Sequence, residues 1–271
     1  MSSAPDWTVP VMRLGYSARA AVYVVLGGLT LAAALWGGDA QGTTSALATL
    51  KGQAWGVALL WLIGIGFWCY AAWRLTAAAY DLENRGDDTE GGFARMMLAV
   101  TGIIHAALGV AIVRLAMGSG GSGGGASDWT ATVMQLPFGK WLAVIAGLGI
   151  LGAGVHYVLK GYEQKYKRHI EVTDTTRKLD PALRAGFVVY GVILAIVGFF
   201  LTLAAWQSNP EQAMGLGGAL DYIRSMTFGR ILLGVAGLGL LGFALENAVE
   251  ARYRVVEGAD DVETLASRAT G

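Results

Sequence analysis

Three side chains that can carry charge lie inside long apolar runs of this sequence: Arg74, His156 and Glu246. An ionised group within a membrane segment is costly unless it finds an opposite charge, a hydrogen-bond partner or water, so such residues are candidates for function. The chemistry they offer is ion pairing and the binding or passage of a polar solute. Whether they can act together depends on the elements that carry them.

An internal repeat predicts that these residues meet. Phe138-Gly139 aligns with Phe228-Gly229 on a shift of 90 residues, and with Trp55-Gly56 on a shift of 83. The same shifts place Trp73, His156 and Glu246 at one level and Arg74, Tyr157 and Asn247 at the next. If the repeats close around a pseudo-threefold axis, these six residues form two polar layers near the cytoplasmic leaflet, where Arg74 and Glu246 could pair.

The preceding apolar runs add four secondary candidates, namely Arg19, Tyr23, His105 and Tyr190. Tyr23 aligns with His105 and Tyr190 in the repeat. The alternative for all ten residues is ordinary anchoring, in which long polar side chains near helix ends extend to the interface. The sequence leaves both interpretations open.

Histidine pairs in membranes can also hold haem, which raises the question of His105 and His156. By the rise of an α-helix, His105 lies about 15 Å from the cytoplasmic start of its span, and His156 about 6 Å from the end of its own. Axial ligands should lie near one level. We therefore expect no haem, and no other cofactor or metal.

The elements that carry these residues are predicted to be membrane helices. The composition is 54% hydrophobic and 15% charged, and about 20 apolar residues suffice to cross a bilayer. Six stretches qualify, roughly 16–36, 55–79, 95–117, 139–160, 183–206 and 228–249. Lipid leaves no partner for an open strand edge, so each stretch must be helical.

The repeat groups the six spans into three tandem two-helix hairpins. We expect one membrane domain of residues 1–271, with repeats at about 10–80, 93–164 and 180–252 and a polar tail over 253–271. The predicted fold class is an all-α membrane protein with pseudo-threefold symmetry. Fifteen of the 20 lysines and arginines fall on the side of the two termini, which predicts that both termini are cytoplasmic in a bacterial inner membrane.

Several classes are excluded by composition and motif. The formal net charge of zero argues against nucleic-acid binding. Gly147-x-Gly149-x-x-Gly152 matches a dinucleotide motif only in letters, since it falls mid-span rather than between a strand and a helix. No catalytic spacing of Ser, His and Asp, and no paired carboxylates, occur within the spans. We therefore expect a protein that is not an enzyme and binds no nucleotide.

The first repeat reads Arg13-Leu14-Gly15-Tyr16-Ser17-Ala18-Arg19, followed by Tyr23 and Gly27, and an aromatic-Gly pair opens each second helix. This pattern resembles a bacterial family of integral membrane proteins known only as a domain of unknown function, in three tandem two-helix copies. The middle copy departs most, because Thr101 stands in the place of Arg19 and His105 in that of Tyr23. The resemblance implies the fold and assigns no site residues.

Two functions stay open. The first is a non-enzymatic accessory or scaffold protein that binds another membrane protein or lipid through glycine- and tryptophan-rich faces. The alternative is a conduit for an ion or small solute, which would use the polar layers near the cytoplasmic leaflet.

Overall fold

Six long helices form the body of the protein in a computed structural model, which describes residues 6–39, 41–86, 88–119 and 126–255. Each is long and apolar enough to cross a membrane, which confirms the predicted six spans. The helices are α1 (Thr8–Trp36), α3 (Gly56–Tyr80), α4 (Thr89–Ala116), α6 (Gly139–Tyr162), α7 (Asp174–Trp206) and α9 (Gly229–Tyr253). Most of the predicted polar tail, from residue 256 onward, lies outside the described residues.

A short helix precedes the second long helix of each repeat: α2 (Thr43–Leu50), α5 (Ala126–Met134) and α8 (Leu216–Ser225). Single 3₁₀ turns, η1 (Lys165–Arg168) and η2 (Pro210–Gln212), complete the connections. Helices α2 and α8 bury one face each, as in α8, where Ala219, Leu220 and Ile223 are buried, whereas α5 buries Thr130 alone. The short helices therefore cover the end of the bundle at which the outer loops are predicted.

The aromatic-Gly motif has a steric cause. A Cβ added at the glycine that opens α3, α6 or α9 would overlap a carbonyl oxygen at the end of the preceding short helix; the pairs are Gly56–Leu50, Gly139–Val133 and Gly229–Arg224. The aromatic residue before the glycine is exposed, with Trp55 57%, Phe138 83% and Phe228 74% accessible. Glycine thus permits the close turn, and the aromatic ring is placed where a membrane interface would lie.

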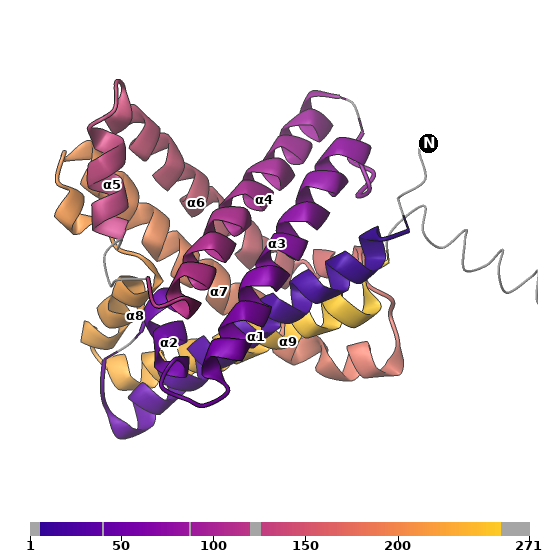
Figure 1. The fold of residues 1–271 in the computed structure, drawn as a ribbon, viewed down its shortest axis with the longest axis horizontal. Helices are drawn as coiled ribbons and strands as arrows, with labels where there is room; N and C mark the ends of the chain where they lie inside the picture. Colours follow the sequence, from indigo (N-terminus) through magenta and orange to yellow (C-terminus); the bar gives the residue numbers. More distant parts are fainter. Residues whose placement is uncertain (1–5, 40, 87, 120–125, 256–271) are drawn as a thin grey trace, which may run out of the picture.

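The long helices pair in a cyclic order. The second helix of each repeat packs along the first helix of the next, giving α3 with α4, α6 with α7, and α9 with α1, which closes the ring (Figure 1). Glycines bring the backbones together, as where Gly154 of α6 meets Gly191 and Ala195 of α7. The three pairs give the pseudo-threefold arrangement that the repeat predicts.

The symmetry is broken inside the middle repeat. α1 packs against α3 and α7 against α9, whereas α4 and α6 form no comparable interface among the residues that the structure describes. In Figure 1 the α3–α4 pair and the α6–α7 pair slope in opposite directions and diverge toward the top of the view. We use the name α4–α6 gap for the surfaces of α4 and α6 that lack the partner helix found in the other repeats; they carry Met97 and Val100 on α4 and Gly149 and Gly152 on α6.

Candidate functional site

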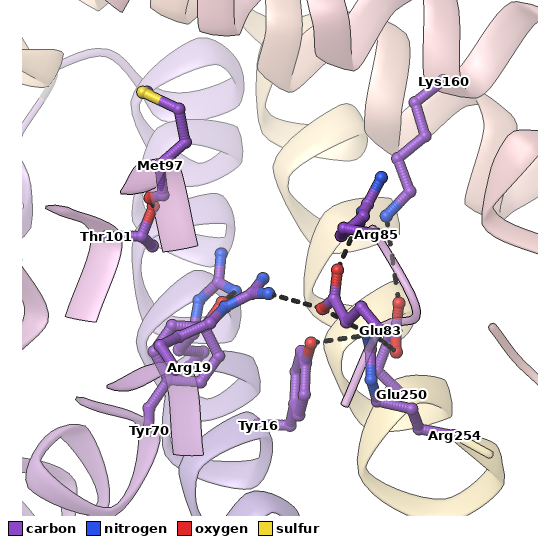
Figure 2. Close-up of polar contacts among 11 residues, drawn as sticks. Tyr16, Arg19, Tyr70, Glu83, Arg85, Met97, Thr101, Lys160, Glu250 and Arg254 are labelled. Atoms are coloured by element: carbon purple, nitrogen blue, oxygen red, sulfur yellow. Dashed lines mark hydrogen bonds and ion pairs between the residues drawn. The ribbon is translucent and has the colours of Figure 1, made fainter. Parts of the chain in front are cut away.

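The buried carboxylate of Glu83 accepts hydrogen bonds from three arginines near the end of α3. Glu83 follows α3 in the loop, and its side chain is 4% exposed. Its Oε1 accepts from Arg74 Nη1 at 2.9 Å and Arg254 Nη2 at 2.7 Å, and its Oε2 accepts from Arg85 Nη2 at 2.7 Å (Figure 2). One carboxylate thus links α3, the loop before α4 and the end of α9.

Arg254 continues the cluster toward α9 and α6. Its Nη1 donates to Glu250 Oε2 at 2.5 Å and to the Tyr16 hydroxyl at 3.0 Å. Lys160 of α6 places its Nζ 3.9 Å from Glu250 Oε1. The backbone holds Arg254 in place through an antiparallel bridge with Ile170. The end of α9 is therefore fixed to the loop that joins α6 and α7.

Tyr70 carries the hydrogen bonds deeper into the bundle. Its hydroxyl accepts from Arg74 Nε at 2.8 Å and from Arg19 Nη1 at 2.6 Å, so two guanidinium groups meet at one oxygen. Arg19 is 4% exposed, and its Cζ lies 4.6 Å from the Tyr70 ring centroid. We call the connected residues the polar network, comprising Tyr16, Arg19, Tyr70, Arg74, Glu83, Arg85, Lys160, Glu250 and Arg254.

The electrostatics of the network outside the helices follow from this geometry. Burial acts to raise the pKa of Glu83, but Arg74, Arg254 and Arg85 together outweigh it and hold that pKa well below its ordinary value. Burial acts to lower the pKa of Arg254, but Glu250, Tyr16 and Glu83 outweigh it, so that pKa lies above its usual range. Both groups are therefore ionised at neutral pH.

An aromatic layer lies beyond Arg19. The Tyr23 hydroxyl donates to the Tyr190 hydroxyl at 2.8 Å, and the Tyr190 and Phe243 rings stack with centroids 3.9 Å apart. Tyr157 packs edge-on against Tyr190 at 5.2 Å. Helices α1, α6, α7 and α9 thus meet at one layer of rings.

The predicted Arg74–Glu246 pair is wrong, because Arg74 pairs with Glu83 instead. Glu83 lies in a loop past the helix end, where aligning helical positions gives no guidance. Glu246 is buried in α9 at 5% exposure. The neighbouring Asn247 donates a hydrogen bond from its Nδ2 to the Phe243 carbonyl oxygen, one turn earlier in α9, at 2.7 Å.

The other predicted residues divide into those brought together and those left apart. Trp73 is buried, and the Arg254 Cζ lies 5.7 Å from its ring. Tyr157 joins the aromatic layer, whereas the adjacent His156 is exposed on α6 and does not enter the predicted polar layer. The helical rotation between neighbouring positions, about 100°, sends the two side chains to different faces.

The secondary candidates gather near the centre. Arg19, Tyr23 and Tyr190 meet as described, and His105 of α4 packs on Tyr70 with ring centroids 4.5 Å apart. Its Nδ1 lies 2.8 Å from the Thr101 carbonyl oxygen. His105 thus faces α3 while His156 is exposed on α6, so the structure does not bring the two histidines together.

Sequence reasoning missed Glu83, Glu250 and Arg254. At the end of α9, the four-residue spacing of Glu246, Glu250 and Arg254 places three charged groups one turn apart on one face, which is a signal for an ordered charged face. The Glu83 position carries no such periodic signal. Only the packing of α3 against α1, and of α1 against α9, brings it to Arg254.

The second notable region is the α4–α6 gap. A Cβ added at Gly149 or Gly152 of α6 would meet no atom within 4 Å. On α9, the repeat-equivalent residues Gly239 and Gly242 pack against α7, at Val189 and at Ala182 with Gly186. On α3, Gly66, the equivalent of Gly149, packs against Ala18 of α1. The same glycine face is therefore buried in repeats one and three and open in repeat two.

Side-chain volume on α4 explains why the middle repeat stays open. Gly15 and Ala18 of α1 lie directly against α3. Aligned through Tyr23 and His105, the corresponding residues of α4 are Met97 and Val100, and both are exposed. Larger side chains at these positions prevent the backbone approach that small residues allow.

Comparison with known proteins agrees with this architecture. The family model described as Domain of Unknown Function (DUF1206) matches three times, at residues 14–81, 96–164 and 185–254. A relative from Bacillus subtilis (strain 168), "Uncharacterized protein YxxB", is 27% identical over 252 residues, covering 92% of each chain. No solved structure matches the chain. The chain is a multi-pass membrane protein of three tandem repeats, and it belongs to the DUF1206 family.

Proposed function

We propose that this protein is a non-enzymatic accessory or scaffold protein of the bacterial inner membrane, with both termini cytoplasmic, that binds another membrane protein or lipid at the α4–α6 gap. The observation that carries the proposal is the open face of α6. Gly149 and Gly152 are unpacked there, whereas their equivalents in α9 lie in helix–helix interfaces. A glycine face suited to close packing, with no neighbour among the described residues of its own chain, is suited to an external ligand.

The polar network supports this function by fixing the helices on either side of the gap. It ties the α3–α4 loop to α9 through Glu83 and Arg254, and α6 to α9 through Lys160 and Glu250. Removing one partner of a buried ion pair strongly lowers the stability of the protein, because the other charge is left buried and unpaired. The network therefore fixes the loop before α4 and the end of α6 to α9, on either side of the gap.

Purification from native membranes, followed by mass spectrometry of what stays bound, tests the proposal. The variant Gly149→Leu/Gly152→Leu fills the α6 face, and Gly28→Leu is the matched control, because Gly28 of α1 also has no atom near its Cβ position. We expect the double variant to lose a component that the wild type and the control retain. Equal retention by all three proteins would contradict the proposal.

A second candidate, the conduit, is favoured by the chain of contacts from Arg85 through Glu83, Arg74, Tyr70 and Arg19. Beyond the aromatic layer, fully buried apolar side chains fill the described centre, among them Leu26, Leu60, Ile193 and Leu240. Entry of an ion into such a region is costly. The buried apolar side chains therefore favour the accessory function over the conduit.

Flux measurements in proteoliposomes separate the two candidates. A conduit should lose flux in Arg74→Gln and Glu246→Gln variants while the binding of any partner persists. The accessory function predicts no flux above that of empty liposomes for the wild type, and loss of partner only in the Gly149→Leu/Gly152→Leu protein.

A further inference from the structure

We propose that the α4–α6 gap is a binding site for one anionic phospholipid of the cytoplasmic leaflet. Its acyl chains lie between the glycine face of α6 and the apolar face of α4, and its phosphate lies at Lys160 and Arg85. This inference rests on the proposed function and specifies its ligand. Three observations carry it: the shape of the walls, the charge at one end, and the charge balance of the buried residues behind it.

The walls of the gap suit a deformable chain better than a rigid helix. On α4, the equivalents of the packed Gly15 and Ala18 of α1 are exposed, with Met97 36% and Val100 39% accessible. Close helix association in membranes requires small residues on both sides, and only the α6 wall has them, at Gly149 and Gly152. Long methionine side chains adapt readily to irregular apolar surfaces.

Basic side chains cluster at the cytoplasmic end of the same gap. His156, exposed on α6, lies within electrostatic range of Lys160, Arg85 and Lys165. The Arg85 side chain is 41% exposed and that of Lys160 is 19% exposed. The Lys160 Nζ forms a long ion pair with Glu250 Oε1 at 3.9 Å, beyond hydrogen-bond distance, and lies 4.6 Å from the Phe187 ring centroid. Basic groups at this level attract the anionic headgroups of the cytoplasmic leaflet.

The buried charges behind this end are unbalanced toward the positive. Among the polar network and the neighbouring Glu246, the side chains less than one-fifth exposed are three carboxylates and four cations, namely Glu83, Glu246 and Glu250 with Arg19, Arg74, Arg254 and Lys160. Arg19 forms no ion pair within 4.0 Å among the described residues, and its Nε has no hydrogen-bond partner there. A phosphate at Arg85 and Lys160 adds negative charge to a network in which the buried cations outnumber the buried carboxylates.

Native mass spectrometry in lipid mixtures tests the proposal. The purified protein is given phosphatidylglycerol and phosphatidylcholine of identical acyl chains, and the lipids that remain bound are counted. We expect one phosphatidylglycerol to be retained at least tenfold more than phosphatidylcholine. Lys160→Gln should remove this preference, whereas Lys140→Gln, the same change near the other end of α6, should leave it intact.

The apolar walls are tested separately. Gly149→Leu/Gly152→Leu should lose the tightly bound lipid, and Gly28→Leu should keep it. For protein whose substitutions impair folding, photocrosslinking of the unaltered chain with a diazirine-labelled phosphatidylglycerol should label peptides of α4 and α6. Labelling spread evenly over all six long helices would overturn the proposal.

Two results distinguish failure of this inference from failure of the proposed function. If the wild type retains both lipids equally but the glycine variant loses a membrane protein, the lipid assignment is wrong and the accessory function stands. If the glycine variant loses neither lipid nor protein, both are wrong. A preference for phosphatidylglycerol that persists in Lys160→Gln would also overturn the placement of the phosphate.

Discussion

The His105 ring of α4 packs on the Tyr70 ring of α3 with centroids 4.5 Å apart, just as Tyr23 of α1 packs on Phe243 of α9 at 4.8 Å. The two pairs occupy equivalent positions in the repeat, and each joins one repeat to the next. The contact of His105 with Tyr70 is thus the equivalent, in the middle repeat, of the contact of Tyr23 with Phe243. An imidazole ring takes the place of the phenol ring. Its position is explained by packing.

This equivalence makes a prediction about substitution. His105→Tyr introduces the residue that stands at the same place in the other two repeats, and we expect it to change the free energy of unfolding by less than about 1.5 kcal/mol. His105→Ala removes the ring contact and should cost about 2–4 kcal/mol. Thermal unfolding in detergent measures both. An alanine variant as stable as the tyrosine variant would contradict the packing role.

Glu83 is expected to be the most sensitive single residue of the polar network. Glu83→Gln leaves Arg74 and Arg254 without their shared carboxylate, and breaking a buried pair in this way costs about 3–5 kcal/mol. The control is Glu163→Gln, whose ion pair with Lys165 involves side chains 41% and 49% exposed, and should change stability by less than about 1 kcal/mol. Chemical unfolding of both variants gives the comparison, and equal costs would refute the assigned role.

The lowered pKa of Glu83 predicts a defined pH dependence of stability. Because the folded pKa lies below the unfolded value of about 4.3, the stabilisation is fully present above about pH 5. It is lost as the pH falls further, since the unfolded state then takes up the proton first. Unfolding temperatures from pH 7 to pH 3 should fall more steeply for the wild type than for Glu83→Gln. Parallel curves would exclude Glu83 as the source.

The width of the α4–α6 gap should depend on side-chain volume. Met97→Ala/Val100→Ala gives α4 the residues that α7 carries at Ala182 and Ala185, and we expect α4 and α6 to move closer. Spin labels at Ile104→Cys and Leu148→Cys, in a Cys69→Ser background, report the distance by pulsed electron paramagnetic resonance. An unchanged distance distribution would show that something other than these side chains holds the helices apart.

The distribution of lysine and arginine predicts the orientation in the membrane. In the Cys69→Ser background, Lys51→Cys should react with a membrane-impermeant maleimide in intact cells with a permeabilised outer layer, because Lys51 follows α2 on the predicted outer side. Glu163→Cys, between α6 and η1, should react only after the membrane is opened. The reverse labelling pattern would invert the proposed topology.

The sequence by itself determined the six spans and their grouping. Uninterrupted apolar stretches must be helices in lipid because no other structure satisfies their backbone groups, and a recurring Phe-Gly or Trp-Gly pair marks each repeat. It also made Arg19, Tyr23, Tyr157 and Tyr190 candidates for a common polar region, because equivalent helical positions face a common axis, but it left ordinary interfacial anchoring equally open.

Only the tertiary structure decided which charges pair and where the bundle is open. Arg74 meets Glu83 because a loop folds back over the end of α3, and loop geometry has no periodicity that a sequence alignment can follow. The α4–α6 gap depends on the fit of two surfaces. Gly149 and Gly152 could accept a close neighbour, but α4 carries the larger Met97 and Val100 at the positions that hold small residues in α1 and α7. Whether two helices pack together depends on the side chains of both, so the sequence of either helix alone does not predict the contact.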